Sequence, residues 1–184
     1  MLDRKEFRDI RSEMAEFEKK REQEIVKSRE IIRLSKLIIN ALHRDDVKDA
    51  AGHANEIKVK IRKLSKENYD MSFNSVALQE YAEALCYYNF VTKKKIPTRK
   101  ELGIDTESYL LGMCDLTGEL VRKAVNSAIK RNFKEVLEIK ELVSDIYSLF
   151  LEFDLRNGEL RKKMDSIKYN LMKLEDLAYK VGMK

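Results

Sequence analysis

The chain has 184 residues and a formal net charge of +5, from 37 Lys and Arg against 32 Asp and Glu. It holds one Pro, six Gly and no Trp, and 38% of its residues are charged. So few turn-forming residues argue against strands and tight hairpins, and the length suffices to bury a core. We therefore predict one all-α domain over residues 1–184. No signal sequence or long uncharged run is present, so we expect a cytoplasmic protein without membrane attachment.

Apolar spacing predicts long helices along the whole chain. They are expected at residues 2–43, from the break at 44–46 to about 68, from Ser72 or Asn74 to Thr92, at 108–130, at 132–153 and at 156–181. Asn132 and Glu135 form a predicted capping box. Residues 93–107, which hold the only proline, are expected to be a connection. The pattern indicates an up-and-down bundle of six to seven helices.

The first predicted helix is unusually long. At 1.5 Å per residue it would span about 60 Å, which exceeds the body of a compact domain of this size. Its N-terminal half has a narrow apolar stripe formed by Phe7, Ile10, Met14 and Phe17. We expect this half to pack on another subunit, within a larger oligomer.

The excess of positive charge lies in residues 58–66, 93–100 and 156–184. Such stretches either face a polyanion or form solvated helix surfaces, and charge alone does not decide between the two.

Two pairs of carboxylates stand on helices that are otherwise apolar. Glu80 and Glu83 share a narrow polar strip, and Asp115 and Glu119 are one turn apart. Carboxylates are rarely placed on such helices without a positive partner, so the four predict a metal site. The alternative is that Glu119 pairs with a basic residue one turn later and that the two glutamates reach solvent. Gly112 and Gly118 leave room near the second pair for another helix or a phosphate.

The types of candidate ligand narrow the choice of metal and of reaction. His43 and His53 have no glutamate three residues earlier, which excludes the di-iron pattern of ferritin-like bundles. Carboxylate oxygens alone favour Mg²⁺ or Mn²⁺, and such sites support cleavage of phosphodiesters or phosphoanhydrides. Cys86 and Cys114 are expected in the core. Both histidines are expected at helix ends or on the surface.

Three blocks of the sequence carry a family resemblance. LQEYAEA at 78–84 and YLLGMCDLTGELVRKAVNSA at 109–128 resemble the translin-associated factor X branch of the translin family. Ser35, Lys36 and the triplet at 42–44 fit the same branch, whereas LRNGELRKKMDSIKYNLMKLEDLAYKV at 155–181 resembles the tail of translin itself.

The resemblance implies a seven-helix bundle that assembles into a barrel, octamer-like, around RNA or single-stranded DNA. In the catalytic branch it implies a Mg²⁺-dependent endoribonuclease, whose acidic positions match Glu80, Glu83 and Asp115, with Glu119 alongside. Its active-site lysine matches Lys36. Translin, the silent branch, lacks the two glutamates and the aspartate. The resemblance therefore favours an active nuclease.

By the same resemblance, nucleic acid is expected to contact Lys36, Arg44 and Arg122. The chain also departs from the family, because residues 71–75 lack the basic and histidine cluster that translin has there, and residues 93–107 are shorter than in the animal catalytic branch. We expect assembly with itself alone.

Two other functions stay open from the sequence. One is a translin-like protein that binds single-stranded nucleic acid without cutting it. The other is an all-α Mg²⁺-dependent nucleoside triphosphate pyrophosphohydrolase, although its second acidic pair is typically Glu-x-x-Asp, and here it is Asp-x-x-x-Glu.

Overall fold

The computed structural model describes residues 2–64 and 71–183, and within these ranges it holds seven α-helices and no strand. The helices are α1 (Arg4–His43), α2 (Val47–Ile61), α3 (Met71–Lys93), α4 (Arg99–Leu102), α5 (Thr106–Ile129), α6 (Phe133–Leu151) and α7 (Glu159–Gly182). The predicted all-α bundle of six to seven helices is confirmed. No described helix is both long enough and apolar enough to cross a bilayer.

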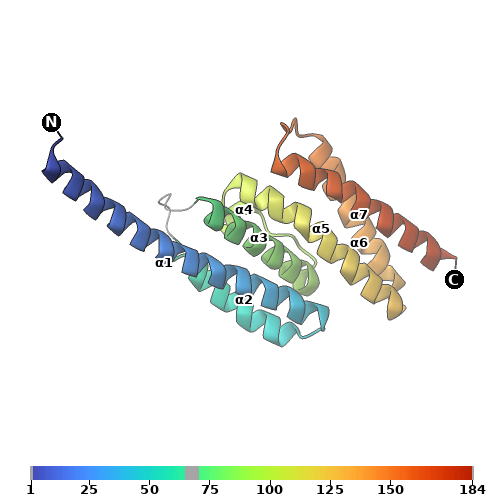
Figure 1. Ribbon diagram of the computed structural model, residues 1–184. Coiled ribbons are helices and arrows are strands. Elements are labelled where there is room, and N and C mark those ends of the chain that lie inside the picture. The colour runs from blue at the N-terminus through green and yellow to red at the C-terminus, as the bar shows by residue number, and fades with distance from the viewer. Residues whose placement is uncertain (1, 65–70, 184) are drawn as a thin grey trace.

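The bundle is ordered much as the chain runs. In Figure 1, α1 and α2 lie on one side, α6 and α7 on the other, and α3 and α5 between them. The apolar faces of all six long helices meet in one core, with fully buried Leu34, Leu85, Leu120, Ile139 and Ile167 among its members. Cys86 and Cys114 are free thiols in this core, as predicted, and burial raises the pKa of each to about 12.

The two central helices, α3 and α5, pack closely because residue 112 is a glycine and has no side chain. A Cβ atom on Gly112 of α5 would lie 2.6 Å from the Cβ of Ala82 and 2.7 Å from the carbonyl oxygen of Gln79, both on α3. Only glycine permits this approach, which confirms the predicted helix contact at Gly112. At Gly118 the nearest atom would be 3.9 Å away, so that glycine is not needed for packing.

Several predicted helix ends were wrong. The third helix begins at Met71, so Asn74 lies inside it, where its Oδ1 accepts a hydrogen bond from the Ser28 hydroxyl at 2.8 Å. The second helix ends at Ile61, and the rest of its predicted range falls partly on residues 65–70, outside the described residues. Asp105 caps α5, which therefore starts before Ser108.

Two caps also differ from expectation. The connection at residues 93–107 contains α4, whose capping box joins Thr98 and Glu101 in both directions. At the start of α6 the predicted box is only half formed: Asn132 accepts from the Glu135 backbone at 3.3 Å, while the Glu135 side chain accepts from Ser127.

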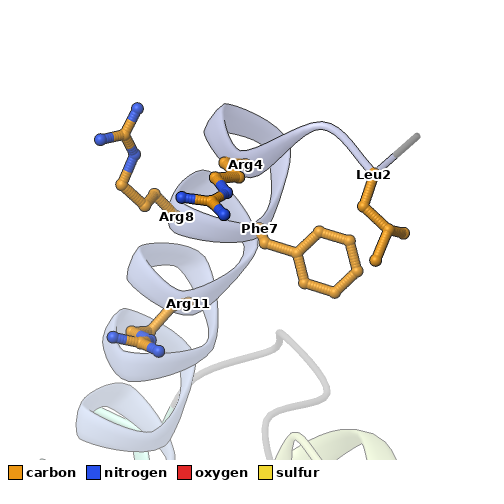
Figure 2. A pocket seen from close by; sticks show the side chains of 5 residues that line it. All are labelled: Leu2, Arg4, Phe7, Arg8 and Arg11. Carbon is orange, nitrogen blue, oxygen red and sulfur yellow. The ribbon is translucent and has the colours of Figure 1, made fainter.

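The N-terminal half of α1 projects beyond the bundle (Figure 1). Its apolar stripe is open to solvent, with Phe7 58% exposed and Met14 64% exposed. Figure 2 shows Leu2 and Phe7 on one side of its first turns and the guanidinium groups of Arg8 and Arg11 on another. A helix with such a surface has an apolar face that the described chain does not cover.

Candidate functional site

A cavity of about 340 Å³ opens over α3, between α1 and α5. Its lining consists of Lys36, Ile39, Asn40, Glu80, Glu83, Glu119 and Arg122. Five of the predicted site residues therefore converge on one hollow, although they come from three helices. The sequence could suggest this because Glu80 and Glu83 share a helix face, but it could not show which helices would face them.

Glu83 is the most constrained of the carboxylates. Only 9% of it is exposed, and burial together with the charges of Asp115 and Glu80 raises its pKa to about 8. Burial also raises the pKa of Glu80, and the neighbouring Lys36 opposes that rise. Three acidic neighbours thus crowd one buried carboxyl group, which is an arrangement that a cation would relieve.

Asp115 has partners that sequence reasoning missed. Lys163 of α7 donates to both of its carboxylate oxygens, at 2.8 and 2.6 Å, and Gln79 of α3 donates to one of them. Lys163 belongs to the basic stretch at 156–184. This contact shows that it pairs with a carboxylate of the site. No signal in the sequence could pair Lys163 or Gln79 with Asp115.

Glu119 contacts His43, which lies at a helix end as predicted but is buried rather than on the surface. His43 is the last residue of α1, but its side chain is only 3% exposed. Its Nε2 meets Glu119 Oε2, and its Nδ1 lies 3.2 Å from the Tyr87 hydroxyl. When Nε2 of a neutral imidazole donates to the Glu119 carboxylate, Nδ1 accepts from the Tyr87 hydroxyl. Arg122 lies farther off, with its Nη1 3.9 Å from the same carboxylate.

Arg44 does not line the cavity. It donates to the Asn40 side chain and lies 3.4 Å from Asp49 in a salt bridge, so it reaches the cavity only through Asn40. The basic stretch at 93–100 is partly neutralised, since Lys94 pairs with Glu135 and Lys95 with Glu101.

The donor set suits a hard divalent cation, because every candidate ligand is a carboxylate oxygen. Within the described residues, however, no three His, Cys, Asp or Glu side chains stand together so that they could hold a metal ion. The reason lies in the contacts above: Asp115 is turned to Lys163, and Glu119 to His43. Coordination would require these two side chains to turn toward Glu80 and Glu83.

Sequence comparison decides the family. A family model described as the translin family matches residues 19–184. The chain belongs to the translin family. Over 151 residues it is 36% identical to an uncharacterized protein of Methanocaldococcus jannaschii, a match that covers 78% of this chain and 68% of that one.

Both branches of the translin family are among the relatives. Translin-associated protein X of Pongo abelii is 26% identical over 97% of this chain and 78% of its own length. Human translin is 33% identical over 46% of this chain, but that match spans only 37% of the translin. The predicted resemblance to this family is confirmed.

Solved structures agree with the fold. The chain is similar to apo-NeC3PO, with a TM-score of 0.89 and 30% identity over 98% of both chains. It is also similar to AfC3PO in a complex with duplex RNA, with a TM-score of 0.86 and 23% identity over 97% of both chains.

Proposed function

We propose that this translin-family chain is a Mg²⁺-dependent endoribonuclease that cleaves RNA, with single-stranded DNA as a second substrate. The observation that carries the proposal is the crowding of acidic side chains around the buried Glu83. Glu80 and Glu119 line the same cavity, together with Lys36, and the charge of Asp115 also raises the pKa of Glu83. A fold needs no such crowding for stability, because like charges brought together in a buried place oppose folding.

The names of the relatives support this reaction class. One similar structure is a complex with duplex RNA, and translin-associated protein X aligns with nearly the whole chain. By the resemblance of the sequence motifs, this chain has the acidic residues that the catalytic branch has. We extend RNA binding to this chain on that basis.

The proposal gives the charged side chains of the site their tasks. Glu80, Glu83, Asp115 and Glu119 would hold Mg²⁺, or Mn²⁺, through their carboxylate oxygens. Such an ion, when bound, would act as a Lewis acid on the phosphate, offset charge on the leaving oxygen and orient a water for attack.

The remaining residues would act on the RNA and on the ligands. Lys36 lies beside Glu80 and would attract a phosphate oxygen of the strand. The contact from His43, itself bonded to Tyr87, fixes the rotamer of Glu119. Arg122 is exposed at the rim and would contact the strand's backbone, as would Arg44 more distantly. Contacts to phosphates predict weak sequence preference and strong dependence on salt.

The two alternatives from the sequence make different predictions about substrates. A pyrophosphohydrolase would hydrolyse nucleoside triphosphates in Mg²⁺, and a non-catalytic binder would leave both RNA and triphosphates intact. We expect cleavage of an end-labelled single-stranded RNA of mixed sequence and no release of pyrophosphate from the four triphosphates. Hydrolysis of triphosphates with intact RNA would replace the nuclease by the second enzyme.

Self-assembly completes the proposal. The exposed stripe of α1 that contains Phe7 and Met14 would be covered by a second copy, so that several cavities enclose one RNA. This oligomer needs no second type of subunit.

A further inference from the structure

A second and larger cavity lies on another side of α3. Its volume is about 610 Å³, and it is bounded by α2, α3 and residues 97–103. From α3 it is lined by Tyr81, Leu85 and Asn89, which are four residues apart and so form a stripe on the helix. That stripe is turned well away from Glu80 and Glu83. None of the residues given a task above lines this cavity.

Two cations stand at this cavity without a partner. Lys58 on α2 and Arg62, which caps the end of that helix, are one turn apart, and neither forms an ion pair with any residue in the described ranges. Lys60, between them, is by contrast paired with Glu30 at 2.7 Å. Two unpaired like charges one turn apart repel each other, and an anion bound between them would remove that repulsion.

Tyr81 adds a hydrogen-bond donor beside the cations. It is only 3% exposed, and its hydroxyl bonds to no residue in the described part of the chain. No fully buried polar side-chain atom there lacks a partner, so this hydroxyl must open onto the cavity. Arg62 lines the same cavity, and its charge opposes the rise that burial causes in the pKa of Tyr81. Lysine, arginine and phenol together suit a phosphate better than a carboxylate.

The rest of the cavity suits a ligand group with an apolar face and a polar edge. Leu85, Pro97 and Leu102 give apolar walls. Asn89 donates one amide hydrogen to the Leu85 carbonyl, at 2.8 Å, and within the described residues its other hydrogen and its Oδ1 form no hydrogen bond. Glu101, held ionised by the Thr98 backbone and Lys95, offers an acceptor on a third element. A donor and acceptors beside apolar walls match the edge and face of a nucleobase.

We propose that this cavity binds a nucleoside monophosphate, either free or as the phosphorylated end of an oligonucleotide. The phosphate would lie between Lys58, Arg62 and Tyr81, and the nucleoside against Leu85 and Leu102. The proposal does not depend on the nuclease activity, since it uses other residues on another side of α3.

Calorimetric titration in EDTA tests this site while the carboxylate cavity stays without metal. The probes are adenosine 5′-monophosphate, the dinucleotide ApA with and without a 5′-phosphate, and inorganic phosphate. We expect the monophosphate to bind, and Arg62→Gln to weaken binding at least tenfold. Tyr81→Phe removes only the hydroxyl and is expected to weaken binding about threefold to tenfold. Lys48→Gln, at the far end of α2, is the matched control and should change nothing.

The dinucleotide separates the two sources of the phosphate. Tighter binding of phosphorylated ApA than of the monophosphate identifies an oligonucleotide end, and the reverse identifies the free nucleotide. The proposal is overturned if neither binds at millimolar concentration, if Arg62→Gln and Tyr81→Phe leave binding unchanged, or if inorganic phosphate or unphosphorylated ApA binds as tightly. Melting curves of each variant confirm that it is folded.

Discussion

At the scale of single residues, Glu83 is the carboxylate, among those in the described residues, whose ionisation the fold opposes most. Its pKa is raised from 4.5 to about 8. Below about pH 4.5 both the folded and the unfolded chain hold this proton. Between the two values only the folded chain keeps it, so the metal-free protein loses stability as pH rises through this window.

Glu83→Gln removes this dependence. In EDTA we expect the variant to exceed the wild type in free energy of unfolding by about 1–3 kcal/mol at pH 9, and by less than about 0.5 kcal/mol at pH 4. Urea unfolding at both pH values measures this. Glu56→Gln, at an exposed position on α2, is the control and should shift stability alike at both. An equal gain for Glu83→Gln at both pH values would contradict the raised pKa.

Lys163 makes a second prediction at this scale, because its ammonium group occupies the Asp115 oxygens that a metal would need. Lys163→Gln should therefore tighten Mg²⁺ binding by about threefold to tenfold, since it removes a competing charge. Calorimetric titration with Mg²⁺ checks it, with Lys168→Gln on the same helix as control. Unchanged or weaker Mg²⁺ binding would show that Lys163 does not compete.

Some of the contacts at this site could be predicted from the sequence, and others could not. Helix periodicity placed Glu80 with Glu83 and Asp115 with Glu119, and the family resemblance added Lys36. The contacts of Lys163 and His43 join positions 48 and 76 residues apart in the chain. No local pattern encodes such pairings, because they depend on how α1, α5 and α7 pack.

At the scale of elements, the site depends on the close contact of α3 and α5 at Gly112. The long helices could be predicted because their apolar faces repeat over many turns. The four-residue α4 could not, since it is too short for any repeat and is fixed by its Thr98 cap.

Gly112→Ala should push α5 away from α3. The added Cβ would meet backbone atoms, which cannot turn aside, so we expect a loss of about 1–3 kcal/mol in free energy of unfolding. Gly118→Ala on the same helix has no atom closer than 3.9 Å and should be neutral or stabilising by up to about 1 kcal/mol. Thermal or urea unfolding of the two variants decides this, and equal stability would refute the close-contact account.

At the scale of the whole molecule, α1 is longer than the bundle that it belongs to. Its N-terminal half exposes Phe7, Ile10 and Met14, and the sequence could predict this overhang from helix length alone. Which surface covers the stripe could not be predicted, because no described part of this chain packs on it.

Light scattering tests the proposed self-assembly. We expect the wild type to have a mass several times that of one chain, and the double variant Phe7→Ser, Met14→Ser to have a lower mass with unchanged helical circular dichroism. Val26→Ser, at another exposed apolar position of α1, is the control. A monomeric wild type would contradict an enclosed RNA site.

The central claim is that the crowded carboxylates cut RNA, and one measurement tests it most directly. An end-labelled single-stranded RNA is incubated with Mg²⁺ and either the wild type, Glu83→Gln or Glu56→Gln, and binding of the same RNA is measured in parallel. We predict cleavage by the wild type and by Glu56→Gln, and a loss of at least about 100-fold for Glu83→Gln with RNA binding retained. Intact RNA in every reaction, or equal cleavage by Glu83→Gln, would contradict the account.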